Sequence, residues 1–144
     1  MKYAKAALDL NPSHAFSNND YGLALCNIKR FEECETHIEK AMELDPIRRH
    51  SYEQFLPLLY MAMRESEKAL EWSNILHDRN GHSRFDGFRA AIFVHLGDIE
   101  SGKAYLKKFK VQRPEIANIE DYKEVTPGIC EDYLMEGLGP IWSP

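Results

Sequence analysis

Three sets of residues have side chains that could do chemistry: a histidine-rich turn, the cysteines and an isolated histidine. The turn reads His77-Asp78-Arg79-Asn80-Gly81-His82, and two imidazoles with a carboxylate are ligands that zinc accepts. However, the chain offers no fourth metal ligand at a sequence spacing that indicates a zinc site. Asn80-Gly81 is typical of a helix end. The sequence therefore favours a helix stop over a metal site.

The cysteines are Cys26, Cys34 and Cys130, an odd count without paired spacing or a Cys-x-x-Cys motif. This usage predicts reduced, partly buried thiols in a cytosolic protein. Cys34 takes the place of a small packing residue in its helix. His95 lies in an apolar helix, where we expect it to be packed and hydrogen-bonded rather than catalytic.

The usual catalytic motifs do not occur. We find no phosphate-binding Gly-rich loop, no Gly-x-Ser-x-Gly elbow and no His-Glu-x-x-His pair. Without a constellation of acid, base and ligand, the sequence assigns no catalytic, cofactor-binding or metal-binding residue. We expect the chain itself not to be an enzyme and to need no cofactor.

The composition fits one soluble globular domain. The 144 residues are 44% hydrophobic and 28% charged, which is ordinary for such proteins. The net charge of −5 without a basic stripe argues against a nucleic-acid partner. No apolar run approaches the roughly 20 residues that span a bilayer, and the chain does not begin with a charged-then-apolar leader. We expect a cytoplasmic protein with no membrane partner.

The elements that must position these residues are all predicted to be helices. The patterns place helices at roughly 2–10, 14–28, 31–44, 48–63, 66–79, 84–96 and 99–112. Pro57 falls inside the fourth and predicts a kink there. The alternative is a helix that starts near Leu56, which would leave Tyr52 and Phe55 outside it.

The helix expected at Arg84–Leu96 is apolar on nearly every side, and such a helix must be covered all round. We expect Gly87, Ala90, Ala91 and Val94 to face neighbouring helices. The other side would be covered by residues 115–144, which carry many apolar side chains outside the repeats.

A repeat runs through most of the chain. Residues 7–12 (Ala-Leu-Asp-Leu-Asn-Pro) recur as residues 41–46 (Ala-Met-Glu-Leu-Asp-Pro), and position 7 to position 41 is a step of 34. Pro114 lies 68 residues after Pro46, which is two further periods. At the intermediate period no proline occurs, and Gly81 stands one residue after the expected position 80. Each period also has a polar turn before a small residue that opens a second helix; these residues are Cys34, Ala69 and Gly102.

These residues resemble the tetratricopeptide repeat family, whose 34-residue unit is a helix–turn–helix. The resemblance covers roughly residues 1–114. It implies an all-α solenoid of antiparallel helix pairs in a right-handed superhelix. The divisions would be a half repeat at 1–12, repeats at 13–46, 47–81 and 82–114, and a C-terminal capping segment at 115–144. Because the first half repeat lacks its partner helix, we expect an excised piece of a longer protein. The alternative is that the first helix is itself a cap.

The end of the chain carries a second resemblance. Pro114 is expected to open a short helix, Thr126-Pro127-Gly128 to break it, and a second helix to end before Gly139-Pro140. The pattern Ile119-x-Asp121-Tyr122, Pro127, Glu131-x-Tyr133-Leu134-x-Glu136-Gly137-Leu138 is similar to the C-terminal end of proteobacterial class III adenylate/guanylate cyclase-like proteins with tetratricopeptide repeats. It departs from that family after Leu138, where Gly139-Pro140-Ile141-Trp142 replaces a basic residue and Ala-Gly-Leu-Pro.

Two functions follow as expectations. The first is a non-catalytic interaction module that binds a protein or peptide on its concave face, as part of a larger bacterial signalling protein. The second is the regulatory or assembly end of a nucleotide cyclase whose catalytic domain is absent here; the upstream sequence of the parent gene distinguishes them. A homodimer is left open. The predicted partner-binding residues are Phe16, Asn19, Leu23, Glu53, Tyr60, Phe85, Phe88 and Ile92. Since only Asn19 suits a carboxylate clamp, a chaperone tail is not the expected ligand.

Overall fold

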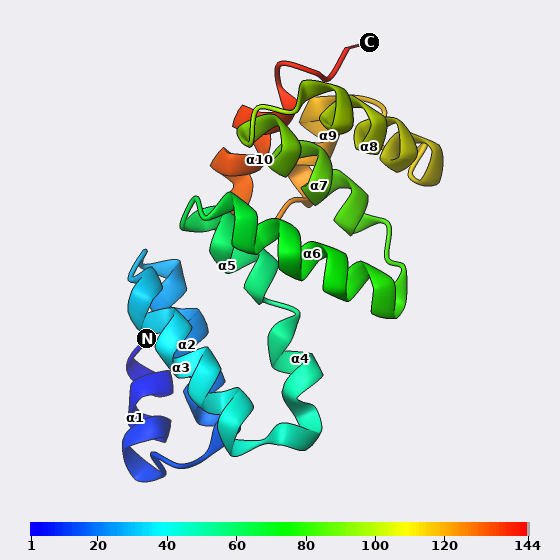
Figure 1. Cartoon of the computed structure of the whole chain (residues 1–144). Coiled ribbons are helices and arrows are strands. Elements are labelled where there is room, and N and C mark those ends of the chain that lie inside the picture. The colour runs from blue at the N-terminus through cyan, green and yellow to red at the C-terminus, as the bar shows by residue number, and fades with distance from the viewer. Residues whose placement is uncertain (144) are drawn as a thin grey trace. The chain divides into compact units, whose positions relative to one another are not determined.

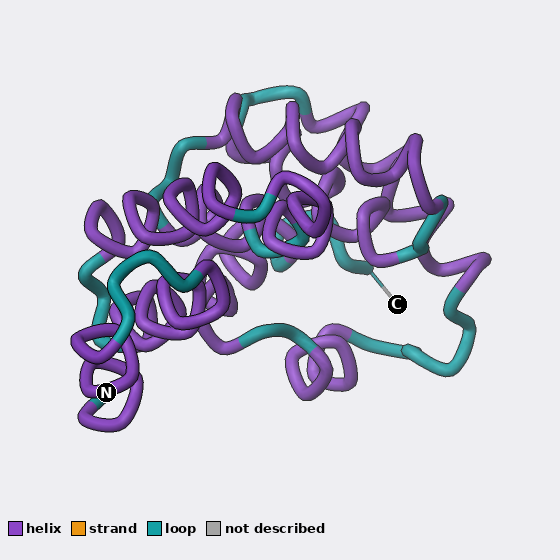
Figure 2. Tube along the Cα trace, turned by 90° about the horizontal axis from the view of Figure 1, so that it is seen from below, coloured by secondary structure: helices purple, strands orange, loops and turns teal. Residues whose placement is uncertain are grey.

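A computed structural model describes residues 1–143, and every regular element in that range is helical (Figures 1 and 2). The predicted all-α class is therefore confirmed. The helices are α1 (Lys2–Leu10), α2 (Ala15–Asn27), α3 (Phe31–Leu44), α4 (Arg49–Glu53), α5 (Leu56–Ala62), α6 (Ser66–Asn80), α7 (Arg84–His95), α8 (Ile99–Gln112), α9 (Ile119–Val125) and α10 (Glu131–Leu138), with short 3₁₀ turns η1 (Pro46–Arg48) and η2 (Gly128–Cys130). Among the described residues, no helix is both long and apolar enough to cross a membrane.

The chain divides into two compact units, residues 1–59 and residues 60 onward. In unit 1, α2 and α3 form an antiparallel hairpin. Its helices approach closely at Gly22, where an added Cβ would lie 3.1 Å from the carbonyl oxygen of Cys34. Nearby, Leu25 and Ile38 are fully buried. The glycine thus allows two backbones to meet where a larger residue would hold them apart.

The single kinked helix expected over residues 48–63 is wrong. The chain instead forms α4 and α5, separated at Gln54 and Phe55. Pro57 stands in the first turn of α5, where its missing N–H costs no helical hydrogen bond. Tyr52, which a late helix start was expected to leave outside, is buried at the end of α4, and its hydroxyl donates to Asp45 Oδ2 (3.3 Å).

Unit 2 is built around α7. All of its residues from Phe85 to Ile92 are buried, and α6, α8 and α10 pack on it. Two glycines on the neighbouring helices permit this packing. A Cβ on Gly102 would lie 3.0 Å from the Ala90 carbonyl oxygen, and one on Gly137 would lie 2.8 Å from the Ala91 carbonyl oxygen. The helix that is apolar on nearly every side is thus enclosed by helices of its own unit.

The C-terminal residues supply part of that enclosure. Tyr122 of α9 is buried with its ring centroid 5.2 Å from that of Phe109. Its hydroxyl would lie 2.9 Å from a Cβ built on Gly87. The short helix expected to open at Pro114 is wrong in position, because Pro114 lies in a turn and α9 begins at Ile119. Asn118 is its N-cap and accepts a hydrogen bond from the N–H of Asp121 (2.9 Å).

The same turn joins the helices of three hairpins. A left-handed residue follows α2, α5 and α7, with φ values of 65°, 61° and 87° at Lys29, Arg64 and Gly97. The next residue donates its N–H to a carbonyl five residues back in each case; the pairs are Arg30 to Leu25 (3.0 Å), Glu65 to Tyr60 (2.8 Å) and Asp98 to Phe93 (2.8 Å). These turns satisfy carbonyl groups at the helix end.

Three helices, α1, α3 and α8, end in the same way. Asn11, Asp45 and Arg113 have φ values of −146°, −135° and −128°, and each precedes a proline. Proline disfavours the helical region for the residue before it, so each helix stops there. α6 ends instead at Gly81, which is left-handed with φ 63°. The predicted helix stop at Asn80-Gly81 is confirmed.

Candidate functional site

Three predicted partner-binding residues lie on α2 in unit 1. Phe16 is 59% exposed, and Asn19 and Leu23 are half-buried. Residues spaced by three and four positions share one face of a helix, so these side chains form a continuous strip. The strip is an apolar surface with one amide. We refer to Phe16, Asn19 and Leu23 as the α2 strip.

Glu53 and Tyr60 do not offer free surface. Glu53 is only 2% exposed. It accepts a hydrogen bond at Oε1 from Arg49 Nε (2.8 Å), and its Oε2 lies 3.6 Å from His50 Nδ1. Tyr60 is also buried, and Lys68 Nζ lies 5.3 Å from the centroid of its ring. The Glu53 carboxylate is therefore occupied by its basic neighbours, and the Tyr60 ring is occupied by packing.

The remaining three predicted residues, Phe85, Phe88 and Ile92, lie together on α7 in unit 2. All three are buried, and the rings of Phe85 and Phe88 meet edge to face with centroids 5.9 Å apart. They form part of the core of unit 2. Of the eight predicted residues, five are buried, Asn19 and Leu23 are half-buried, and Phe16 alone is exposed.

Sequence reasoning overlooked a buried ion pair on α7. Arg89 Nη2 donates to Asp86 Oδ1 (2.6 Å), and its Nη1 donates to Asn74 Oδ1 (3.2 Å). The guanidinium carbon lies 4.5 Å from the ring centroid of Tyr105. The available signal was an acid and a base three residues apart, a spacing that allows contact along a helix. Because most other residues of α7 are apolar, the sequence did not identify Asp86 and Arg89 as a buried pair.

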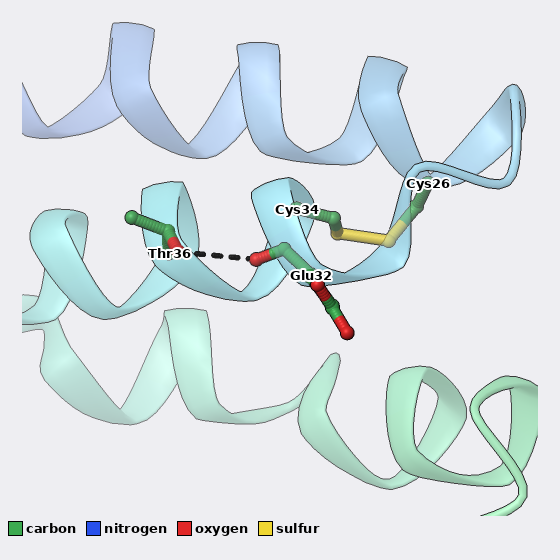
Figure 3. Close-up of a disulfide and its surroundings, with 4 residues drawn as sticks. All are labelled: Cys26, Glu32, Cys34 and Thr36. Carbon is green, nitrogen blue, oxygen red and sulfur yellow. Dashed lines mark hydrogen bonds between the residues drawn. A yellow bond between two sulfur atoms is a disulfide. The ribbon is translucent and has the colours of Figure 1, made fainter.

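The prediction of free thiols at Cys26 and Cys34 is wrong, because the two form a disulfide with a Cα–Cα distance of 5.4 Å. Figure 3 shows the bond between the last turn of α2 and the first turn of α3. In the same turn of α3, the Thr36 hydroxyl donates to the carbonyl oxygen of Glu32 (3.1 Å). The tight reversal between the helices brings together cysteines that the sequence separates by eight positions. Both side chains are buried.

The third cysteine, Cys130, is free and buried. Burial raises the pKa of its thiol to about 12, and its Sγ donates to the carbonyl oxygen of Pro127 (3.6 Å). Since the thiolate is the reactive form, burial and the raised pKa lower the reactivity of Cys130 in the folded protein. It is a packing residue of η2.

The histidine-rich turn is used in local hydrogen bonds. The N–H of His82 donates to Asn80 Oδ1 (3.0 Å), and His82 Nδ1 accepts from the N–H of Arg84 (3.1 Å). Within residues 1–143, no three His, Cys, Asp or Glu side chains are grouped so that they could hold a metal ion.

His95 is packed and hydrogen-bonded as expected. One ring nitrogen, Nε2, lies 2.8 Å from the carbonyl oxygen of Tyr133. The two rings are stacked with their centroids 3.9 Å apart. The histidine therefore helps to fix α10 against α7.

Comparison with models of known protein families and with curated proteins finds no match for this sequence.

Proposed function

We propose that the chain is a tetratricopeptide-like helical-repeat module that binds a protein or peptide without catalysing a reaction, within a larger signalling protein. The observation that carries this proposal is the recurrence of one turn geometry. Lys29, Arg64 and Gly97 adopt the same left-handed conformation after successive first helices, at intervals of 35 and 33 residues, close to the 34-residue period of the sequence. Each turn leads into a second helix whose first turn contains a small buried residue.

Those small residues support the proposed repeat. Cys34 and Ala69 are fully buried, and Gly102 is buried against α7. A repeat of this kind needs a small side chain where the two antiparallel helices come closest, because the backbones approach within van der Waals contact. The pattern is present in both compact units, so it does not depend on how the units are arranged.

The α2 strip is the proposed binding surface. Phe16 is a large exposed aromatic side chain, and aromatic anchors contribute much of the free energy of binding in protein interfaces. Asn19 adds a group that can both donate and accept hydrogen bonds, which suits a peptide backbone. An apolar peptide side chain would pack on Phe16 and Leu23 while its backbone contacts Asn19.

The cyclase alternative gains no separate support from the end of the chain. The residues that carry that resemblance include Tyr133, Leu134, Gly137 and Leu138, which are all buried. Gly137 lies against Ala91 and Tyr133 stacks on His95. Packing on α7 accounts for these residue types in any protein with this arrangement of helices.

A peptide selection tests the proposal. A random library of twelve-residue peptides displayed on phage would be selected against the full chain, and enriched peptides measured by fluorescence anisotropy. We expect Phe16→Ser to weaken binding by tenfold or more, because the aromatic anchor is lost. Leu23→Ser should act in the same direction.

The matched control is Ile47→Ser, which removes an apolar side chain that is 93% exposed in η1 and is not part of the α2 strip. It should leave the dissociation constant unchanged. If no peptide is enriched, or if enriched peptides ignore the Phe16 substitution, the α2 strip is not the binding surface.

A further inference from the structure

Unit 2 contains a pocket that is separate from the α2 strip. Its volume is about 270 Å³, and it lies where α7, α8 and α9 meet. Its apolar lining consists of Phe88, Phe109, Ile116, Tyr122, Val125 and Pro127. The first four of these side chains are buried, so the floor of the pocket is a fixed part of the core.

The remainder of the lining is basic. It contains His82, Arg84 and Arg113, together with Thr126 and no Asp or Glu. Burial lowers the pKa of His82, and the positive charges of Arg84 and Arg113 lower it further. All three side chains line the same pocket. In a chain with a net charge of −5, this is a local concentration of positive charge beside an apolar floor.

Arg113 and His82 retain donors for a ligand. Arg113 pairs through Nε with Glu115, an exposed residue of the adjoining turn. A guanidinium has five N–H donors, so that this pairing leaves others. His82 accepts at Nδ1, and its neutral ring can therefore donate from Nε2. Burial lowers the pKa of Arg84, but a guanidinium keeps its positive charge in a protein.

We propose that this pocket binds a small aromatic carboxylic acid, with the ring on the apolar lining and the carboxylate against Arg113 and His82. Planar guanidinium groups recognise carboxylates through paired hydrogen bonds. Ligand pockets combine an apolar lining with a few polar groups that fix orientation, and span roughly 300–1,000 Å³. A pocket slightly below that range limits the ligand to about one ring and a short chain. The site does not depend on the peptide-binding role proposed above.

The test uses 3-phenylpropionate, its neutral amide 3-phenylpropanamide, and inorganic phosphate as probes of the full chain. Binding is followed by amide chemical shifts in two-dimensional NMR spectra. We expect the acid to shift amides of residues 82–88, 113–116 and 122–126. The amide, which lacks the charge, should bind at least tenfold more weakly than the acid. Phosphate should also bind more weakly than the acid, because it has no ring to pack on the apolar lining.

Variants locate the carboxylate. Arg113→Gln and His82→Gln should each weaken binding of 3-phenylpropionate, the first by tenfold or more, while the spectrum shows that the fold is kept. Lys107→Gln removes an exposed positive charge on α8 outside this pocket and should change nothing. Equal affinity for acid and amide, shifts that map elsewhere, or an Arg113→Gln variant that binds like the wild type would each overturn the proposal.

Discussion

Two glycines, Gly102 of α8 and Gly137 of α10, determine how closely these helices can approach α7. Gly137 is the more demanding of the two, because the atoms around its missing Cβ belong to the backbone and Cβ of Ala91, all within 2.9 Å. Backbone atoms cannot rotate away as the end of a long side chain can. A methyl group at this position must therefore move one helix from the other.

We predict that Gly137→Ala destabilises the protein by about 1–3 kcal/mol, the usual range for overpacking a core. This result would oppose helix propensity, which favours alanine over glycine. Unfolding in urea measures the difference. Gly128→Ala is the matched control, since no atom lies within 4 Å of its missing Cβ. Equal stability of the two variants would contradict the close contact.

The Asp86–Arg89 pair makes a second prediction for single residues. Both side chains are at least 92% buried, and a buried charge without its partner is costly. Asp86→Ala should lower the free energy of unfolding by about 3–5 kcal/mol. The double variant Asp86→Ala with Arg89→Met removes both charges and should recover most of that loss. A double variant as unstable as the single one would show that the ion pair is not the cause.

Among the elements, the hairpin of α2 and α3 is cross-linked near its turn. The disulfide joins residues separated by eight positions and so restricts a short loop of the unfolded chain. The chain-entropy relation gives about 2–3 kcal/mol for a loop of this length. We predict that Cys26→Ala with Cys34→Ala, or the addition of a reductant, lowers stability by that amount.

Thiol labelling checks the cross-link directly. Without reductant, iodoacetamide should label no cysteine in the native protein, because Cys130 is buried with its pKa raised to about 12. After unfolding in guanidinium, one thiol should react. Three reactive thiols would contradict the disulfide. A Cys130→Ala variant serves as control and should show the same sensitivity to reductant as the wild type.

The helix bounds were largely predictable from sequence. α1, α3 and α8 begin and end where the apolar pattern and the following Asn-Pro, Asp-Pro and Arg-Pro pairs place them. These are local signals, carried by adjacent residues. At Pro57 the kinked helix was preferred and a start near Leu56 was the alternative, because a proline is compatible both with a kink and with a new first turn. The alternative start is the one that α5 has.

The long-range contacts were less predictable. The disulfide depends on which sides of α2 and α3 face each other, and a three-cysteine count does not reveal that. The basic pocket combines His82, Arg113 and Tyr122, which come from three separate segments. Only the fold brings such residues together, so no spacing in the sequence marks them as a site.

At the level of the whole molecule, α7 depends on residues far along the chain. Gly137 and Tyr133 contact it from α10, and Tyr122 contacts it from α9. We predict that ending the chain after residue 114 destabilises unit 2 and exposes apolar surface. Binding of a hydrophobic dye, with urea unfolding, measures both. If neither changes, the C-terminal helices contribute no more than a linker would.

The enclosure of α7 also sets the order in which the protein can fold during its synthesis. The residues of unit 1 leave the ribosome first and contain all the partners of their own hairpin. α7 is synthesised next, but α10, the last of the helices that pack on it, lies some forty positions further along the chain. At about 5–20 residues per second, α7 waits on the order of seconds for the helix that completes its burial. During this interval, the face of α7 that later packs on Gly137 and Tyr133 lacks these neighbours.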